Sequence, residues 1–246
     1  MKTNPLFRAV ILMTLIVTLA SMHTSYQKND KKILVFSKTA GFHHNSIAAG
    51  SKAILKLGEE NKFLVDTTTD ASRFSGDNLK QYAAIIFLNT TGDVLNDEQQ
   101  SAFEQYIKKG GGFAGIHAAT DCEYEWPWYG NLVGAYFVSH PAIQEAALTI
   151  TDQKHISTKG LPSLWTRRDE WYNFKWVATG LHILITIDET SYKGGTMGAN
   201  HPMAWYHDYD GGRAFYTELG HTDAAYADPL YLGHILGGIQ YAMGSK

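Results

Sequence analysis

The chain has 246 residues, of which 44% are hydrophobic, and one hydrophobic core still serves a single domain at this length. Its formal net charge of −3 at pH 7 gives nucleic acid no electrostatic reason to bind, so we expect no nucleic-acid partner. The only cysteine, Cys122, excludes an intramolecular disulfide, so the core must hold the fold together.

The first 25 residues have the pattern of an export signal. Lys2 and Arg8 precede an apolar run over residues 9–20, which is too short for a permanent membrane helix. We expect residues 1–25 to be a signal peptide and the protein to be periplasmic or secreted, without membrane association after signal removal. Removing this segment changes the formal net charge from −3 to −5. An uncleaved anchor is the alternative, because no clear A-x-A cleavage site is present.

Short apolar runs and amphipathic stretches alternate through the first half of the remaining chain. A helix is predicted from Asn45, with Ile47, Ile54 and Leu55 on its apolar face. A second helix is predicted from Asn96, where Gln99 occupies the capping-box position. The apolar stripe of this second helix comprises Phe103, Tyr106 and Ile107. The runs predicted as buried strands are residues 32–37, 63–67, 83–88 and 113–117.

This alternation predicts an α/β fold of the flavodoxin-like type, a three-layer sandwich with a mostly parallel central sheet. Residues 203–209 and 213–219 flank an Asp-Gly-Gly turn and predict a C-terminal hairpin, followed by a helix over residues 229–243. The sheet is therefore expected to be mixed. Residues 120–173 show few periodic elements and are interpreted as long surface loops.

Histidines follow three of the predicted strands. His43 and His44 come after the first strand, and one of the two is expected to face a site. His117 follows the fourth strand, and His221 follows the hairpin. Because parallel strands bring their carboxyl ends to one edge of a sheet, we expect these imidazoles to converge on one small ligand. The alternative is that each histidine bonds to backbone groups for structural reasons.

Further residues qualify as members of such a site. Asp121 and Glu170 are carboxylates expected at its margin, although Glu170 could equally form one side of a surface ion pair. Tyr172, Trp126 and Trp205 are expected to offer apolar faces to a sugar.

Nucleotide and metal binding have weaker signals in the sequence. A phosphate loop is not indicated, because the triglycine at residues 110–112 precedes a strand instead of following one. No H-x-x-x-H or HExxH spacing is present, so no metal is assigned, but a divalent ion bound by ligands from separate loops stays open. The histidines considered for that ion are His44, His117, His140 and His221, while His201 and His207 raise the same question.

Several blocks of the sequence resemble the ThuA-like (trehalose utilisation) family over residues 31–246: GFHHNSI, GGGFAGIHAATD, DEWYNF, HPMAWYHDYDGGRAFYTELGHT and DPLYLGHILGGIQYAMG. The family is similar in fold to class I glutamine amidotransferases, and GIHAA then occupies the place of their nucleophile elbow. His117 stands where their cysteine would be, and Cys122 lies five residues beyond it. Glutaminase activity is therefore not expected to transfer with the fold.

The resemblance implies activity on a glycoside or a 3-keto-glycoside. Proton transfer beside a ketone or onto a departing sugar oxygen needs groups that titrate near neutral pH. The catalytic candidates are His117, His221, Asp121 and Glu170, and the substrate-binding candidates are His43, His44, Trp126, His140, Tyr172, His201 and Trp205. A small carbohydrate is the expected partner, and no cofactor other than the divalent ion is indicated. The alternatives are a non-catalytic sugar-binding module and a metal-dependent hydrolase.

Overall fold

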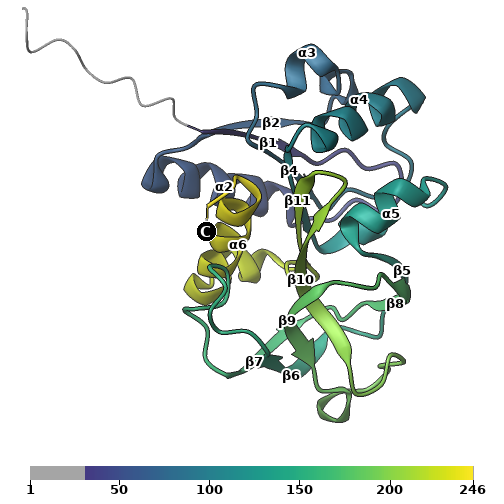
Figure 1. The fold of residues 1–246 in the computed structure, drawn as a ribbon. Helices are drawn as coiled ribbons and strands as arrows, with labels where there is room; N and C mark the ends of the chain where they lie inside the picture. The colour runs from purple at the N-terminus through teal and green to yellow at the C-terminus, as the bar shows by residue number, and fades with distance from the viewer. Residues whose placement is uncertain (1–30, 246) are drawn as a thin grey trace, which may run out of the picture. The chain divides into compact units, whose positions relative to one another are not determined.

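A computed structural model describes residues 31–245, and the predicted signal peptide lies outside them (Figure 1). All described residues belong to one compact unit. None of the helices in this part of the chain has both the length and the apolar character that a membrane span requires.

Nine strands form one sheet in the order β2-β1-β3-β4-β11-β10-β9-β6-β7, and β5 pairs with β8 in a separate two-stranded sheet. The strands are β1 (Lys32–Phe36), β2 (Leu64–Thr68), β3 (Ala84–Leu88), β4 (Gly112–Ile116), β5 (Ala135–Ser139), β6 (Gln144–Ile150), β7 (Leu164–Asp169), β8 (Asn173–Val177), β9 (His182–Ile187), β10 (His201–Tyr209) and β11 (Gly212–Thr217).

The strands β2, β1, β3, β4 and β11 run parallel to one another. All residues of β3 and β4 are buried, as expected for strands covered on both faces. β2 differs because it lies at the edge of the sheet, where Leu64 is 54% exposed. The prediction of a buried strand over residues 63–67 was therefore right in position and wrong in burial.

Helices cover both faces of this parallel part. α2 and α6 pack on one face, and α4 and α5 lie on the other, with α3 against α4 (Figure 1). The predicted flavodoxin-like, three-layer arrangement is confirmed. The helices are α2 (Ile47–Asn61), α3 (Gly76–Leu79), α4 (Asp97–Lys108), α5 (Pro127–Val133) and α6 (Pro229–Ala242).

Local sequence explains where α4 begins and which face of α2 is buried. Asn96 and Gln99 form the predicted capping box at the start of α4, each side chain accepting a hydrogen bond from the other residue's backbone N–H. In α2 the apolar face contains Ile54 and Leu57, whereas Leu55 is 41% exposed. The assignment of Leu55 to the apolar face was wrong, because position 57, three residues after Ile54, completes the stripe.

The second half of the sheet is antiparallel. The predicted hairpin is present as β10 and β11, and its turn residues Asp210 and Gly211 both have positive φ angles, 49° and 94°. Residues 120–173 are not a set of irregular loops, because they contain α5, β5, β6 and β7. The short strands of this segment lack the apolar runs that reveal buried parallel strands, and β7 alternates exposed and buried residues.

The direction of β7 follows from the number of antiparallel steps. Four antiparallel pairings separate β11 from β7, by way of β10, β9 and β6. An even number of reversals returns the chain to its first direction, so β7 runs the same way as β11 and β4. The residues after β7 therefore leave the sheet at the same edge as those after β4 and β11.

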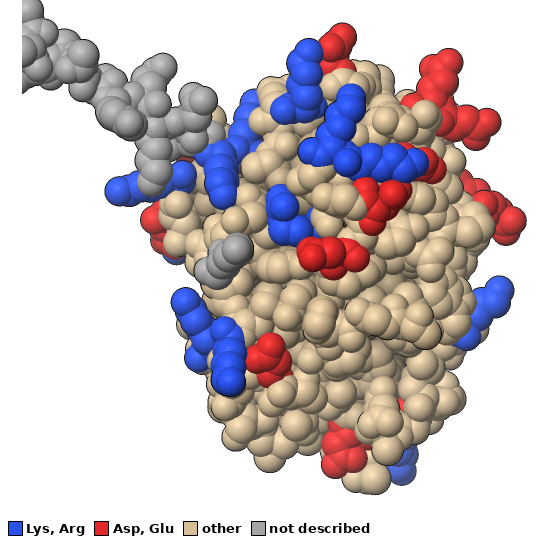
Figure 2. Space-filling model, viewed as in Figure 1, with Lys and Arg blue, Asp and Glu red and all other residues tan. Residues whose placement is uncertain are grey.

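Charged side chains of both signs are mixed on the face seen in Figure 2. Basic groups lie beside acidic ones around α3 and α4, and the lower part of this face carries few charges. Ion pairs such as Lys80 with Asp77 and Lys108 with Glu104 connect neighbours in this region.

We predict that His234, a fully buried residue of α6, makes stability depend on pH. Its ring nitrogens bond to Ser157 O and Thr217 Oγ1, each at 3.0 Å, and burial lowers the pKa of His234 from 6.5 to about 4. The unfolded chain then binds a proton that the folded chain excludes, so stability falls as the pH falls from 6.5 to 4. Between pH 7 and 5 this group contributes a loss of about 2 kcal/mol.

The His234→Gln variant should lose less stability than the parent protein over this pH range. Urea denaturation at pH 7 and pH 5 measures both losses, and other buried histidines contribute equally to the two proteins. Identical losses in the two proteins would exclude His234 as the source.

Candidate functional site

Four side chains meet at the carboxyl edge of the sheet. His44 lies in the loop between β1 and α2, His117 follows β4 directly, His221 follows β11, and Glu170 follows β7. Each of the four offers one nitrogen or oxygen atom, and these atoms lie within 4.8 Å of one another. We refer to this set as the His₃Glu cluster.

His117 occupies a strained turn at the end of β4. Its φ angle is +51°, which places a non-glycine residue in the left-handed region at the start of a short 3₁₀ helix. This strand-to-helix turn matches the position of a nucleophile elbow, where backbone strain presents a side chain above the sheet. The ring is fully buried. The fold therefore holds the His117 imidazole in one position.

A hydrogen bond fixes the tautomer of His117. Its Nδ1 lies 2.6 Å from the backbone oxygen of Glu218, and a carbonyl can only accept, so Nδ1 carries the hydrogen. In the neutral ring Nε2 therefore presents a lone pair. This lone pair faces His221 Nδ1 at 3.1 Å and Glu170 Oε2 at 3.4 Å.

The third side of this triangle joins His221 Nδ1 to Glu170 Oε2 at 3.1 Å. The other carboxylate oxygen of Glu170, Oε1, lies 3.0 Å from His140 Nδ1. The two oxygens of Glu170 thus have different surroundings, since one lies beside His140 and the other faces the imidazoles of His117 and His221.

His44 completes the cluster from the side of β1. Its ring is edge-on to those of His117 and His221, with centroid separations of 4.9 and 5.2 Å. Burial, together with the nearby His117 and His221, lowers the pKa of His44 to about 3, so this ring is neutral at pH 7. Its buried Nδ1 has no hydrogen-bond partner among the described residues.

The buried carboxylate of Asp169 ties the end of β7 to the loop after β11. It accepts hydrogen bonds from the backbone N–H groups of Glu170, Gly220 and His221 at 3.1–3.2 Å. Arg167 supplies the compensating charge at 3.2 Å. Asp169 therefore sets the position of both Glu170 and His221.

Glu218 is hydrogen-bonded to His117 through its backbone oxygen and to Tyr172 through its carboxylate. Its side chain is fully buried and accepts the backbone N–H of Tyr172, and burial with the neighbouring Asp169 raises its pKa well above the usual range. Gly220 has a φ angle of +118°, which only glycine adopts readily, and this releases the chain from β11 so that His221 turns back over the edge.

Three members of the cluster, His44, Glu170 and His221, line a cavity of about 360 Å³, and the buried His117 lies behind them. Asp121 and His140 lie at its margin, and its apolar wall comprises Phe42, Phe137 and Tyr172. Phe42 is 65% exposed, whereas Tyr172 is buried and packs 4.4 Å from the His117 ring. The cavity therefore combines a polar floor with apolar sides.

The charged groups of the cavity shift one another's pKa values. Burial alone would raise the pKa of Glu170, but the close imidazoles of His117 and His221 lower it on balance when they carry a proton. Burial opposes protonation of His221, but the adjacent carboxylate of Glu170 raises the pKa of His221 on balance. Burial raises the pKa of Asp121, partly offset by a 2.6 Å hydrogen bond from Tyr124.

Two tryptophans predicted to wall the site do not reach the cavity. Trp205 is fully buried on β10 and donates to Val133 O, and Trp126 packs against Phe103 and donates to Glu104. Their assignment was wrong because large aromatic side chains were the only signal, and the same rings serve the core.

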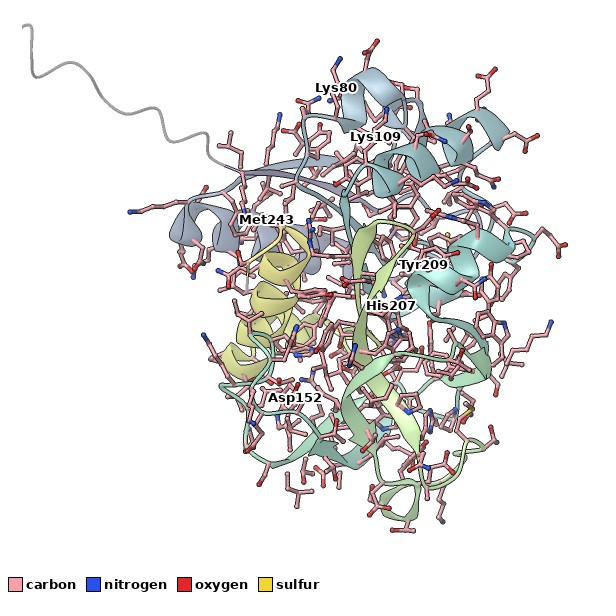
Figure 3. The ribbon with its side chains drawn as sticks, in the orientation of Figure 1. Lys80, Lys109, Asp152, His207, Tyr209 and Met243 are labelled. Atoms are coloured by element: carbon pink, nitrogen blue, oxygen red, sulfur yellow. The ribbon has the colours of Figure 1, made fainter. Side chains whose placement is uncertain are left out.

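Three histidines also lie outside the cavity wall. His201 is buried, and its Nε2 is hydrogen-bonded to the backbone oxygen of Tyr172 at 2.8 Å. It therefore positions a residue of the cavity wall without lining the cavity. His43 is exposed and pairs with Thr39, and His44 is the member of the pair that faces the cluster. His207 on β10 bonds to Leu132 O in the interior, near α5 (Figure 3).

Sequence reasoning missed Phe42, Phe137, Asp169 and Glu218. Glu218 directly follows β11 and precedes His221, so its place at a strand end was a usable signal. Asp169 and Phe137 gave no such signal, because the direction of β7 and the pairing of β5 with β8 depend on long-range contacts.

Comparisons with known proteins identify the fold and the family of the chain. No curated protein matches the chain. The structure of a ThuA-like protein from Bacteroides uniformis has a TM-score of 0.76 and 24% sequence identity, covering 89% of this chain and 94% of its own. A ThuA-like protein from Parabacteroides merdae has a TM-score of 0.74 and 24% identity, covering 88% of this chain and 91% of its own.

A β-galactosidase from Bacillus circulans shares the fold at a TM-score of 0.59 and 12% identity over 89% of this chain, which corresponds to 32% of that enzyme. The family ThuA, described as trehalose utilisation, matches residues 32–242. The chain therefore belongs to the ThuA family.

Proposed function

We propose that the cavity processes a small glycoside or 3-keto-glycoside by proton transfer, with a divalent metal ion held by the His₃Glu cluster. The observation that carries this proposal is the triangle formed by His117 Nε2, His221 Nδ1 and Glu170 Oε2, with sides of 3.1, 3.1 and 3.4 Å. Three electron-pair donors rarely face one another at such distances without a proton or a cation between them.

The triangle fits zinc. Zinc–nitrogen bonds of about 2.0–2.1 Å in a tetrahedron place the donor atoms about 3.3–3.4 Å apart. His117 also has the supporting bond typical of zinc ligands, with its other nitrogen donating to a backbone carbonyl. The unpartnered Nδ1 of His44 adds a neutral imidazole to the set. A bound divalent ion would act as a Lewis acid and favour ionisation of a coordinated water.

The residues at the margin supply the proton transfers. Asp121 has a raised pKa and a place in the cavity wall, which suit a group that exchanges protons with a substrate oxygen or carbon. His140 is 43% exposed and its Nδ1 lies 3.0 Å from Glu170, so it connects the cavity with solvent. Neither residue is required to hold the metal.

The family description and the apolar wall support a carbohydrate substrate. Phe42, Phe137 and Tyr172 offer ring faces of the kind that pack against the carbon–hydrogen faces of sugars. Polar groups at the floor then meet the hydroxyl or keto oxygens. A non-catalytic sugar-binding module would share these walls, but it would not need imidazoles that converge from three strand ends, one of them in a strained backbone conformation.

The purified protein is predicted to bind about one zinc ion per chain. His117→Ala and Glu170→Ala should each weaken zinc binding more than about 100-fold, because loss of even a second-shell partner costs about 10–100-fold. The matched control is His43→Ala, which removes the exposed neighbour of His44 and should bind zinc normally. Metal analysis and titration calorimetry measure these affinities, and equal affinity in all four proteins would exclude this site.

Turnover of a 3-keto-glucoside is predicted to require the cluster. His221→Ala should lower kcat by about 100-fold or more, since it removes a proposed metal ligand and loss of even a second-shell partner costs about 10–100-fold in activity. Its melting temperature without metal should stay close to that of the parent protein, which separates a catalytic role from a structural one. Tight binding of disaccharides with no turnover by the parent protein would instead establish a binding module.

We also propose that residues 1–25 direct export, so the protein acts in the periplasm or outside the cell. Cell fractionation should place a shortened chain, beginning after the apolar run, in the soluble periplasmic or extracellular fraction. Recovery of the full-length chain from the membrane fraction would contradict this proposal.

A further inference from the structure

A second cleft lies at the opposite edge of the sheet, around the start of β11. It has a volume of about 730 Å³ and is larger than the His-lined cavity. β11 spans six residues, or about 20 Å at 3.3 Å per residue, between this cleft and the loop that carries His221. One small molecule cannot fill both, so the cleft would have an occupant of its own.

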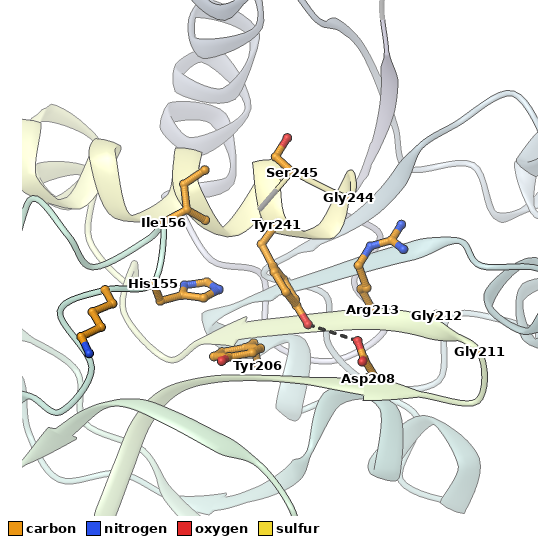
Figure 4. A pocket seen from close by; sticks show the side chains of 11 residues that line it. His155, Ile156, Tyr206, Asp208, Gly211, Gly212, Arg213, Tyr241, Gly244 and Ser245 are labelled. Carbon is orange, nitrogen blue, oxygen red and sulfur yellow. Dashed lines mark hydrogen bonds between the residues drawn. The ribbon is translucent and has the colours of Figure 1, made fainter.

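Aromatic rings form one side of this cleft (Figure 4). Tyr206 stacks on His155 at 4.4 Å and on His182 at 4.8 Å, and these two rings must lie on opposite faces of Tyr206. Tyr241 projects from α6 and stands edge-on to Tyr206 and His155. The stack leaves no slot for a flat ligand to intercalate, but it keeps Tyr241 in a fixed orientation.

Polar groups of several kinds converge beside these rings. Asp208 accepts a 3.4 Å hydrogen bond from the Tyr241 hydroxyl, and Lys154 lies on the loop opposite. Arg213 is anchored through Nε and one terminal nitrogen to Ala242 O and Gly110 O. The Nε2 atom of His155 is buried and has no hydrogen-bond partner in the described part of the chain.

We propose that this cleft is a second, non-catalytic binding site for a neutral saccharide. A saccharide combines apolar carbon–hydrogen faces with many hydroxyl groups, which suits an ordered tyrosine beside a carboxylate, a guanidinium and an ammonium group. A simple anion would meet Asp208 and leave the aromatic side unused. The single carboxylate lining the cleft, Asp208, accepts a hydrogen bond from Tyr241, and the single histidine, His155, bonds to Ser157 and stacks on Tyr206, so we assign the cleft to binding.

Saccharide binding to the full mature chain tests this proposal, with trehalose and maltotriose as probes in titration calorimetry and saturation-transfer NMR. Asp208→Ala should weaken binding at the cleft about tenfold or more, because a hydrogen bond to a charged group is lost. The matched control is Glu145→Ala, which removes an exposed carboxylate on β6 and should change nothing. Tyr241→Phe should bind nearly as well as the parent protein, and Tyr241→Ala should lose binding.

A double variant, His117→Ala with His221→Ala, separates the cleft from the cavity. Binding that survives in this variant and is lost on adding Asp208→Ala supports the cleft. Binding that disappears in the double variant but withstands Asp208→Ala belongs to the cavity and overturns the proposal. No binding of either probe at millimolar concentration also overturns it.

One more outcome distinguishes a saccharide site from an anion site. Arg213 also lines a neighbouring groove that contains Lys80 and Lys109, so the region has several cations. If glucuronate or inorganic phosphate binds while trehalose and maltotriose do not, and Asp208→Ala tightens that binding, the cleft is an anion site and the proposal is wrong. Asp208→Ala should leave turnover at the His₃Glu cluster unchanged in every case.

Discussion

The geometry of the site depends on the buried carboxylate of Asp169. Three backbone N–H groups and a guanidinium surround it, and two of those N–H groups belong to the loop after β11. In a flat sheet, four inter-strand steps would separate the loop after β11 from the end of β7 by about 19 Å. The hydrogen bonds therefore require the antiparallel half of the sheet to coil back on itself. The carboxylate of Asp169, whose charge Arg167 balances, therefore joins the end of β7 to the loop after β11. This contact brings Glu170 next to the imidazoles.

The parallel half of the sheet contributes rigidity of another kind. The left-handed conformation of His117 costs about 1–2 kcal/mol and persists only where the surroundings determine it fully. Here the surroundings are the carbonyl of Glu218, the ring of Tyr172 and a buried 3₁₀ turn. An imidazole in this position cannot swing away from the cavity.

Local patterns were sufficient to predict the parallel core and one part of the site. Apolar runs marked β1, β3 and β4, and the turn residues marked the hairpin of β10 and β11. The meeting of His44, His117 and His221 follows from strand direction alone. The rest required long-range information. Phe137 lies on a strand of the small second sheet, and the alternating pattern of β7 does not reveal which strand it pairs with. Trp126 and Trp205 were misplaced for the same reason, since composition identifies an aromatic residue but not the surface that it covers.

The even number of reversals between β11 and β7 limits how this architecture can vary. Removal of a single strand from the antiparallel half would send Glu170 to the far edge of the sheet, about 20 Å from the histidines. Gain or loss of a complete hairpin would preserve the direction of the strand that precedes Glu170, provided that Asp169 could still reach the loop after β11. Proteins of this fold that keep the carboxylate of Glu170 should therefore differ in the antiparallel half by pairs of strands. A shortened version should likewise be designed by removing strands in pairs.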